Sequence, residues 1–173
     1  YDESYRTPLL ISWPGVTEPG SVCTNLVSNL DFAQTFLDAA GSAAPARMQG
    51  ASLVPLLQGD EDVSWRHSHY YHYYEYPGWH MVYRHEGAYD GRYKLIHYYD
   101  VDEWELIDME TDPNEMVNQY GNPAYKKTVT RMHDELEQLR VLYQVPPNQP
   151  KSVESVTQHY HSDKIKVRSG DSE

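Results

Sequence analysis

The side chains best suited to chemistry in this 173-residue chain gather in one short stretch, on either side of a Pro77-Gly78 break. An arginine there offers a planar fork for carboxylate or sulfate oxygens, and the histidines offer hydrogen-bond donors whose charge is adjustable. Tyrosine and tryptophan rings offer flat faces for a sugar. A polar, anionic ligand could therefore be bound by His72, Tyr74, Glu75, Trp79, His80, Arg84 and His85. The same pattern also fits a structural interpretation, in which tyrosines and histidines pair across the strands of a polar sheet surface.

The sequence contains no self-sufficient catalytic centre. Cys23 lies in VCTNLV, without the glycine-rich turn or helix start that activates a thiolate, and no serine occupies a G-x-S-x-G turn. His67, His69 and His72 are close in sequence, but on an extended strand His72 points away from the other two. Without a bulge in the strand, the three imidazoles therefore cannot converge on a zinc ion. We predict neither a catalytic residue nor a metal ligand in this chain.

The composition argues against two classes of partner. The chain carries 26 acidic and 14 basic residues, a formal net charge of -12, so it has no basic stripe for nucleic-acid phosphates or anionic membrane surfaces. No stretch approaches the roughly 20 apolar residues of a membrane helix. The aromatic residues include 16 Tyr but only 2 Phe, which favours polar pockets over a purely apolar core. The single cysteine excludes an internal disulfide framework.

A small sheet and one helix must position the chemistry-bearing stretch. Residues 67–75 alternate between two faces, and further strands are predicted at 80–88, 92–99 and 104–109, with Asp90-Gly91 as a hairpin turn. A helix starting at Pro123 would lay one apolar stripe across this sheet, formed by Tyr125, Val129, Met132, Leu136, Leu139 and Tyr143. The predicted fold class is α+β, with a four-stranded antiparallel sheet packed by a C-terminal helix.

The region before the sheet has a different character. Residues 7–13 (TPLLISW) are apolar at nearly every position, which predicts a strand buried on both faces. A helix at 32–40, capped by Asn29 or Asp31, and a short helical turn at 52–57 follow. The rest of the chain does not supply layers for both faces of such a strand. We therefore expect this region to be the end of a larger α/β domain.

Six stretches of the chain, in this order, resemble the C-terminal part of formylglycine-dependent (type I) sulfatases of the alkaline phosphatase superfamily. They are YDESYRTPLLISWPG (1–15), NLDFAQTFLDAAG (29–41), MQGASLVPLL (48–57), HYYHYYEYPGWHMVYRHEG (69–87), DGRYKLIHYY (90–99) and EWELIDMETDPNEM (103–116). None of them is a catalytic signature. The specificity of the resemblance lies in the ordered set, which covers most of residues 1–145.

The resemblance implies two regions, residues 1–62 as the end of the α/β catalytic domain and 63–145 as the C-terminal sulfatase subdomain. The polar composition of residues 146–173 predicts a flexible tail. The resemblance also implies that the formylglycine nucleophile and calcium belong to an upstream catalytic domain, the expected partner of this chain. Cys23, followed by Thr24 and Asn25, does not match the nucleophile motif. The fragment is expected to bind no cofactor and to be inactive alone. The full-length protein would hydrolyse sulfate esters, of sulfated glycans, in the periplasm or outside the cell.

In that family the C-terminal subdomain closes one side of the pocket and contacts the leaving-group sugar. The resemblance implies this substrate-binding role for His72, Glu75, His80, Arg84 and His85. Two alternatives stay open. The chain could be a non-catalytic carbohydrate-binding or subunit-interaction module, or the full protein could be a phosphodiesterase or phosphonate hydrolase of the same superfamily, which the upstream nucleophile would decide.

Overall fold

A computed structural model describes residues 1–60 and 62–151 of the chain. These residues divide into two compact units, one up to His67 and one that begins at Ser68. The resemblance to sulfatases implies a boundary between these regions at residue 62. Within the described residues, no helix is both long enough and apolar enough to cross a membrane.

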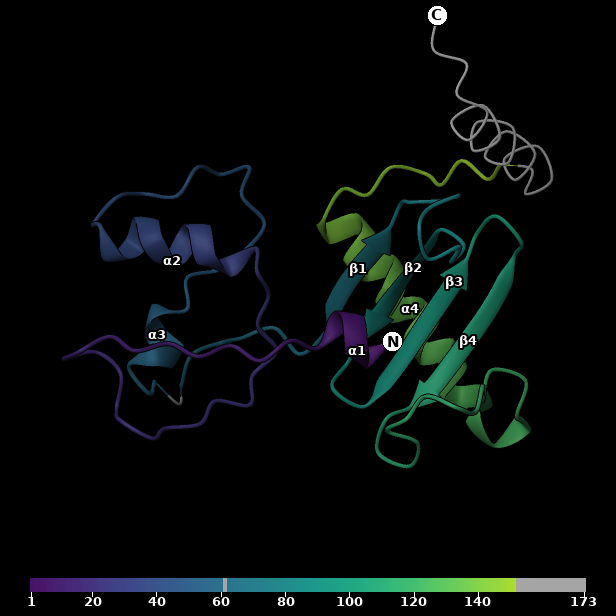
Figure 1. Cartoon of the computed structure of the whole chain (residues 1–173), viewed down its shortest axis with the longest axis horizontal. Helices are drawn as coiled ribbons and strands as arrows, with labels where there is room; N and C mark the ends of the chain where they lie inside the picture. Colours follow the sequence, from purple (N-terminus) through teal and green to yellow (C-terminus); the bar gives the residue numbers. More distant parts are fainter. Residues whose placement is uncertain (61, 152–173) are drawn as a thin grey trace, which may run out of the picture. The chain divides into compact units, whose positions relative to one another are not determined.

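The second unit contains a four-stranded antiparallel sheet whose strands follow one another in chain order (Figure 1). They are β1 (His69–Tyr73), β2 (His85–Tyr89), β3 (Tyr93–Tyr98) and β4 (Glu103–Asp108). The predicted meander and the α+β fold class are confirmed. The second strand begins at His85 and not at residue 80, because Met81 has a φ of 53°, in the left-handed region that a strand does not accommodate.

The Asp90-Gly91 turn connects β2 to β3, as predicted. Gly91 has a φ of 93°, which glycine adopts without steric cost. The Asp90 carboxylate accepts hydrogen bonds from the backbone N–H groups of Arg92 (2.9 Å) and Tyr93 (2.6 Å). These bonds close the turn and set the register in which Tyr89 lies opposite Lys94.

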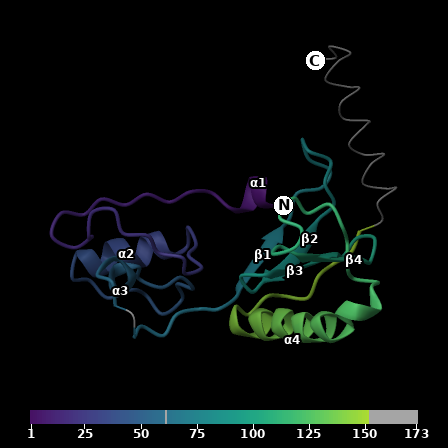
Figure 2. The same cartoon turned by 90° about the horizontal axis from the view of Figure 1, so that it is seen from below.

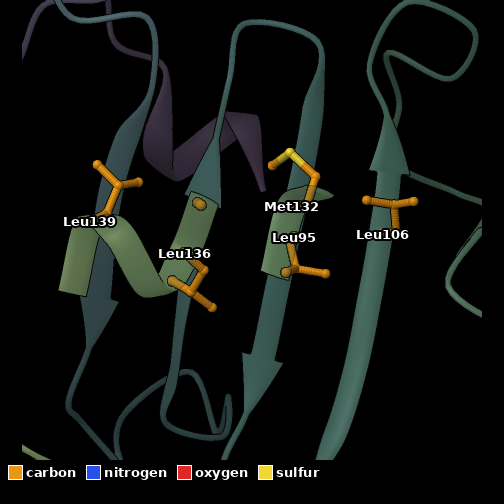
Figure 3. Packing of buried hydrophobic residues seen from close by; sticks show 6 residues of the cluster. Leu95, Leu106, Met132, Leu136 and Leu139 are labelled. Carbon is orange, nitrogen blue, oxygen red and sulfur yellow. The ribbon is translucent and has the colours of Figure 1, made fainter. Parts of the chain in front are cut away.

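One long helix, α4 (Lys126–Leu142), lies along one face of this sheet and follows a short 3₁₀ turn, η1 (Pro123–Tyr125) (Figure 2). The Asn122 side chain caps the turn by accepting a hydrogen bond from the Ala124 N–H. Figure 3 shows leucines of the sheet meeting the apolar residues of the helix. The buried core consists of Ala88, Leu95, Leu106, Met132, Leu136 and Leu139. The helical stripe predicted from spacing is therefore the covering layer of the sheet.

The first unit contains three short helices, α1 (Asp2–Tyr5), α2 (Asp31–Ala39) and α3 (Val54–Leu57). The prediction that Asn29 or Asp31 caps the second of them is wrong, because Leu30 occupies the N-cap position without a side-chain hydrogen bond. Asp31 is fully buried as the first helical residue and accepts two 2.6 Å hydrogen bonds from Arg66. The carboxylate thus ties the start of α2 to a residue far along the chain.

The strand predicted at residues 7–13 is not present. The described residues give this segment no strand partner, and it is extended with Leu10 94% exposed. An apolar strand needs hydrogen-bonded neighbours and a covering layer on each face, and the described residues provide neither to it.

Candidate functional site

The structure distributes the five residues predicted to bind substrate over three places. His72 lies on β1, on the face that α4 covers, and Arg84 directly precedes β2. His85 is the first residue of β2 and points to the opposite face. Glu75 and His80 are exposed in the loop of residues 74–84 that connects the two strands. The residues therefore do not form one cluster, although His72 and Arg84 meet at a shared neighbour.

That shared neighbour is Tyr99, which is only 5% exposed. The Tyr99 hydroxyl lies 3.0 Å from Nε2 of His72, and the Arg84 guanidinium lies 5.1 Å from the centroid of the Tyr99 ring. The other ring nitrogen of His72 lies 2.9 Å from the Tyr70 hydroxyl. Both imidazole nitrogens of His72 are thus occupied within the fold.

Arg84 forms a buried ion pair with Asp100, in the turn that follows β3. Nε of Arg84 donates to Asp100 at 2.8 Å, and Nη2 donates to the second carboxylate oxygen, with 12% and 2% of the two side chains exposed. Burial by itself would raise the pKa of Asp100, but the hydrogen bonds from Arg84 and from the Lys151 backbone N–H outweigh it and lower the pKa. The Arg84 fork that was predicted to hold a ligand anion is mainly engaged by this carboxylate.

Residues 146–151, which we call the C-terminal strap, are fastened to the same part of the second unit. The Asn148 amide donates to Glu86 at 2.6 Å, Arg84 donates to the Gln149 carbonyl at 3.2 Å, and the Lys151 N–H donates to Asp100 at 2.9 Å. The first residues of the predicted flexible tail are therefore anchored, and residues 152–173 lie outside the described part of the chain.

Glu86 is a buried carboxylate that sequence reasoning missed. It is 2% exposed on β2 and accepts hydrogen bonds from the Tyr70 hydroxyl at 2.9 Å, from Asn148 and from Arg140 of α4. Burial raises the pKa of Tyr70 above its ordinary value, and the neighbouring Glu86 charge adds to this effect. Cross-strand register could have signalled this position, because Glu86 lies opposite both His72 and His97.

His85 lies in an aromatic cage on the sheet face that α4 does not cover. Its ring stacks on Tyr73 at a centroid distance of 5.2 Å, with Tyr98 at 5.1 Å and the edge of Tyr71 at 5.8 Å. Nδ1 lies 2.8 Å from the Tyr83 carbonyl oxygen, so Nδ1 carries the proton and Nε2 is the acceptor of the neutral ring. Burial lowers the pKa of His85 because it disfavours the charged form.

This burial predicts a pH-dependent stability. The pKa values of His72, His85 and His133 are all lowered from 6.5, with burial as the main cause. Below about pH 6.5 the unfolded chain therefore binds protons that the folded chain excludes, so the free energy of unfolding falls as the pH drops through this window. Urea unfolding at about pH 7.5 and about pH 5.5 measures the effect. His133→Phe should reduce the difference, and equal stability at both pH values would contradict the prediction.

The loop of residues 74–84 presents the exposed members of the predicted site. Trp79 is 85% exposed, and Glu75 and His80 are exposed on either side of it. The Glu75 side chain packs over Gly78, where an added Cβ would lie 2.7 Å from its Cγ. This loop can offer an aromatic face, a carboxylate and an imidazole to a polar ligand, but no activated nucleophile.

The described residues do not fit the groups that a sulfatase uses for bond cleavage. Within residues 1–60 and 62–151, no group of three or more His, Cys, Asp or Glu side chains could hold a metal ion. Cys23 is exposed and its thiol lies 3.5 Å from the Asn25 side-chain oxygen. A pocket of about 290 Å³ between α4 and the sheet is lined by none of the five predicted residues. We derive no chemical step through calcium or formylglycine from these residues.

Comparison with known proteins places the chain among sulfatases. Residues 1–142 match the family model described as N-sulphoglucosamine sulphohydrolase, C-terminal. An N-acetylglucosamine-6-O-sulfatase of Bacteroides thetaiotaomicron is 44% identical over 159 residues, which are 90% of this chain and 28% of that protein. A Delta 4,5-hexuronate-2-O-sulfatase of the same organism is 31% identical, over 82% of this chain and 32% of that protein.

The fold is also that of solved sulfatase structures. The structure of BT4656 in complex with its substrate D-glucosamine-2-N,6-O-disulfate has a TM-score of 0.73 and 44% identity, over 76% of this chain and 27% of that chain. The phosphonate monoester hydrolase SpPMH from Silicibacter pomeroyi has a TM-score of 0.64 but only 24% identity, over 74% of this chain and 27% of that chain, so it shows likeness in fold alone. The chain spans less than a third of each of these proteins.

Proposed function

The chain belongs to the family of N-sulphoglucosamine sulphohydrolase C-terminal domains, and on this premise we propose that it is the C-terminal part of a sulfatase that hydrolyses sulfate esters of glycans. The observation that carries the proposal is the 44% identity to an N-acetylglucosamine-6-O-sulfatase along 90% of the chain. A solved sulfatase structure that is also 44% identical to this chain contains D-glucosamine-2-N,6-O-disulfate as its substrate. The substrate class we favour is therefore a sulfated glucosamine unit of a glycan.

The chain contributes recognition and not bond cleavage. In the family, formylglycine and a metal ion supply the nucleophile and the stabilisation of charge, and the described residues offer no site for either. The exposed groups of the loop at 74–84 have the chemistry to contact the leaving-group sugar through Glu75, His80 and the Trp79 ring. Such contacts act by placing the scissile ester correctly against the reacting groups.

Activity assays on the full-length protein test this function. The protein, produced with the formylglycine-forming enzyme, should release sulfate from 6-O-sulfated glucosamine and act more slowly on 2-O-sulfated hexuronate. Residues 1–173 expressed alone should release no sulfate from either compound. Hydrolysis of an aryl phosphonate in preference to every sulfate ester would overturn the proposed sulfatase activity. Turnover by residues 1–173 alone would overturn the proposal that this part contributes recognition and not bond cleavage.

A further inference from the structure

We propose, on the basis of the sulfatase function above, that Tyr99 and Asp100 are positioning residues that fix both ends of the loop at residues 74–84. These two neighbours follow β3 and lie outside the loop itself. Tyr99 contacts His72, on which the first loop residue stacks, and both neighbours contact Arg84, the last loop residue. Through these contacts they set the place of the exposed groups at the tip. Two of the residues predicted to bind substrate, His72 and Arg84, serve as their intermediates.

The first end of the loop is held through His72. Tyr74, the first loop residue, stacks on the His72 ring at a centroid distance of 3.8 Å and an interplanar angle of 16°. The His72 ring cannot turn without losing a partner, because Tyr70 lies at 2.9 Å from Nδ1 and Tyr99 at 3.0 Å from Nε2. The orientation of Tyr74 therefore depends on the Tyr99 hydroxyl.

The second end is held through Arg84, the last loop residue. Its guanidinium lies over the Tyr99 ring and donates two hydrogen bonds to Asp100. A bidentate pair of this kind fixes the plane as well as the place of the guanidinium. The strap adds a third restraint, because the Gln149 carbonyl accepts from Arg84 and the Lys151 N–H donates to Asp100.

Between these two ends the loop is exposed at its tip. Trp79 is 85%, Met81 42% and Val82 40% exposed, and a backbone bond of 3.2 Å from Met81 to Gly78 closes a turn inside the loop. The Tyr76 and Tyr83 rings, on the two arms of the loop, lie 4.9 Å apart between centroids and connect the tip to both ends. Because the exposed groups at the tip would contact the leaving-group sugar before and during the reaction, small changes at the ends are expected to weaken binding of the leaving group.

The test compares a large and a small leaving group in the full-length enzyme. Asp100→Asn should raise the KM for a 6-O-sulfated glucosamine oligosaccharide by about tenfold, and Tyr99→Phe should raise it by less, both with little change in kcat. The kcat/KM for 4-nitrophenyl sulfate, whose leaving group carries no sugar, should stay within about twofold. Tyr99→Phe keeps the ring under Arg84 and removes only the hydroxyl, so it should have the smaller effect.

Asp108→Asn is the matched control, because Asp108 forms a bidentate pair with Arg92 (3.0 and 2.9 Å) at the other end of β3. It should leave the KM for the oligosaccharide unchanged. An unchanged KM in both test variants, or equal losses on both substrates in all three variants, would overturn the positioning role. If Asp100→Asn fails to fold, Tyr99→Phe still decides the question. A wild-type enzyme that hydrolyses neither the sulfated oligosaccharide nor 4-nitrophenyl sulfate would instead overturn the proposed function, and with it the role of the loop.

Discussion

Arg140→Met is expected to lower the free energy of unfolding by about 3–5 kcal/mol. Arg140 reaches from α4 to the Glu86 carboxylate on β2, and only 17% and 3% of the two side chains are exposed. Without the guanidinium, a carboxylate whose side chain is almost fully buried keeps the neutral donors Tyr70 and Asn148. Loss of one partner of a buried pair is costly because the remaining charge is left without compensation.

Urea unfolding with a matched variant on the same helix checks this prediction. Arg131→Met removes the ion pair with Asp90, in which Arg131 is 50% exposed, and should cost no more than about 1 kcal/mol. Glu86→Gln combined with Arg140→Met should recover part of the loss, since the double variant leaves no buried charge. Equal effects of the Arg140 and Arg131 substitutions would show that the Glu86 site is solvated in solution.

Lys94→Met is expected to have an effect of similar size, about 3–5 kcal/mol. Lys94 lies on β3 between Tyr93 and Leu95, on the face away from α4, and its side chain is only 1% exposed. Its ammonium group donates a 2.5 Å hydrogen bond to Glu115, whose side chain is 3% exposed. The bond joins the segment after β4 to the sheet, so its loss leaves a buried carboxylate without the ammonium charge.

Thermal and urea unfolding of Lys94→Met and of Lys127→Met give the comparison. Lys127 is exposed on α4, and its replacement should change the free energy of unfolding by no more than about 0.5 kcal/mol. Lys94→Met combined with Glu115→Gln should be more stable than Lys94→Met alone. A Lys94→Met protein as stable as the Lys127→Met control would refute the energetic importance of the pair.

The carboxylates of Glu86 and Asp100 both hold the C-terminal strap, and Asp100 also explains why Arg84 is withdrawn from the predicted site. Each accepts from one arginine and also from one residue of the C-terminal strap. Arg84 has the residue type that suits a ligand anion, and composition alone cannot distinguish that use from a buried ion pair. The distinction depends on Asp100, a carboxylate that chain folding brings against the guanidinium from the turn after β3.

Local periodicity was sufficient for the sheet and its covering helix. Three features depend only on residues close together in the sequence: the alternation of side chains along β1, the Asp90-Gly91 turn and the apolar stripe of α4. Local periodicity gave a wrong prediction where a segment depends on partners that are distant in the sequence. Residues 7–13 have the pattern of a buried strand, yet a strand exists only when hydrogen-bonding partners and covering layers are present, and the described residues supply none to them.

The sequence by itself therefore determined the meander, the helix that packs on it and the resemblance to sulfatases, because these depend on residue order and short-range spacing. Only the tertiary structure decided which polar side chains are used inside the fold. His72 and Arg84 are occupied by Tyr99 and Asp100, whereas Glu75 and His80 stay exposed. The physical reason is that a hydrogen bond or ion pair has two partners, and the second partner is chosen by chain folding and not by the residue type of the first.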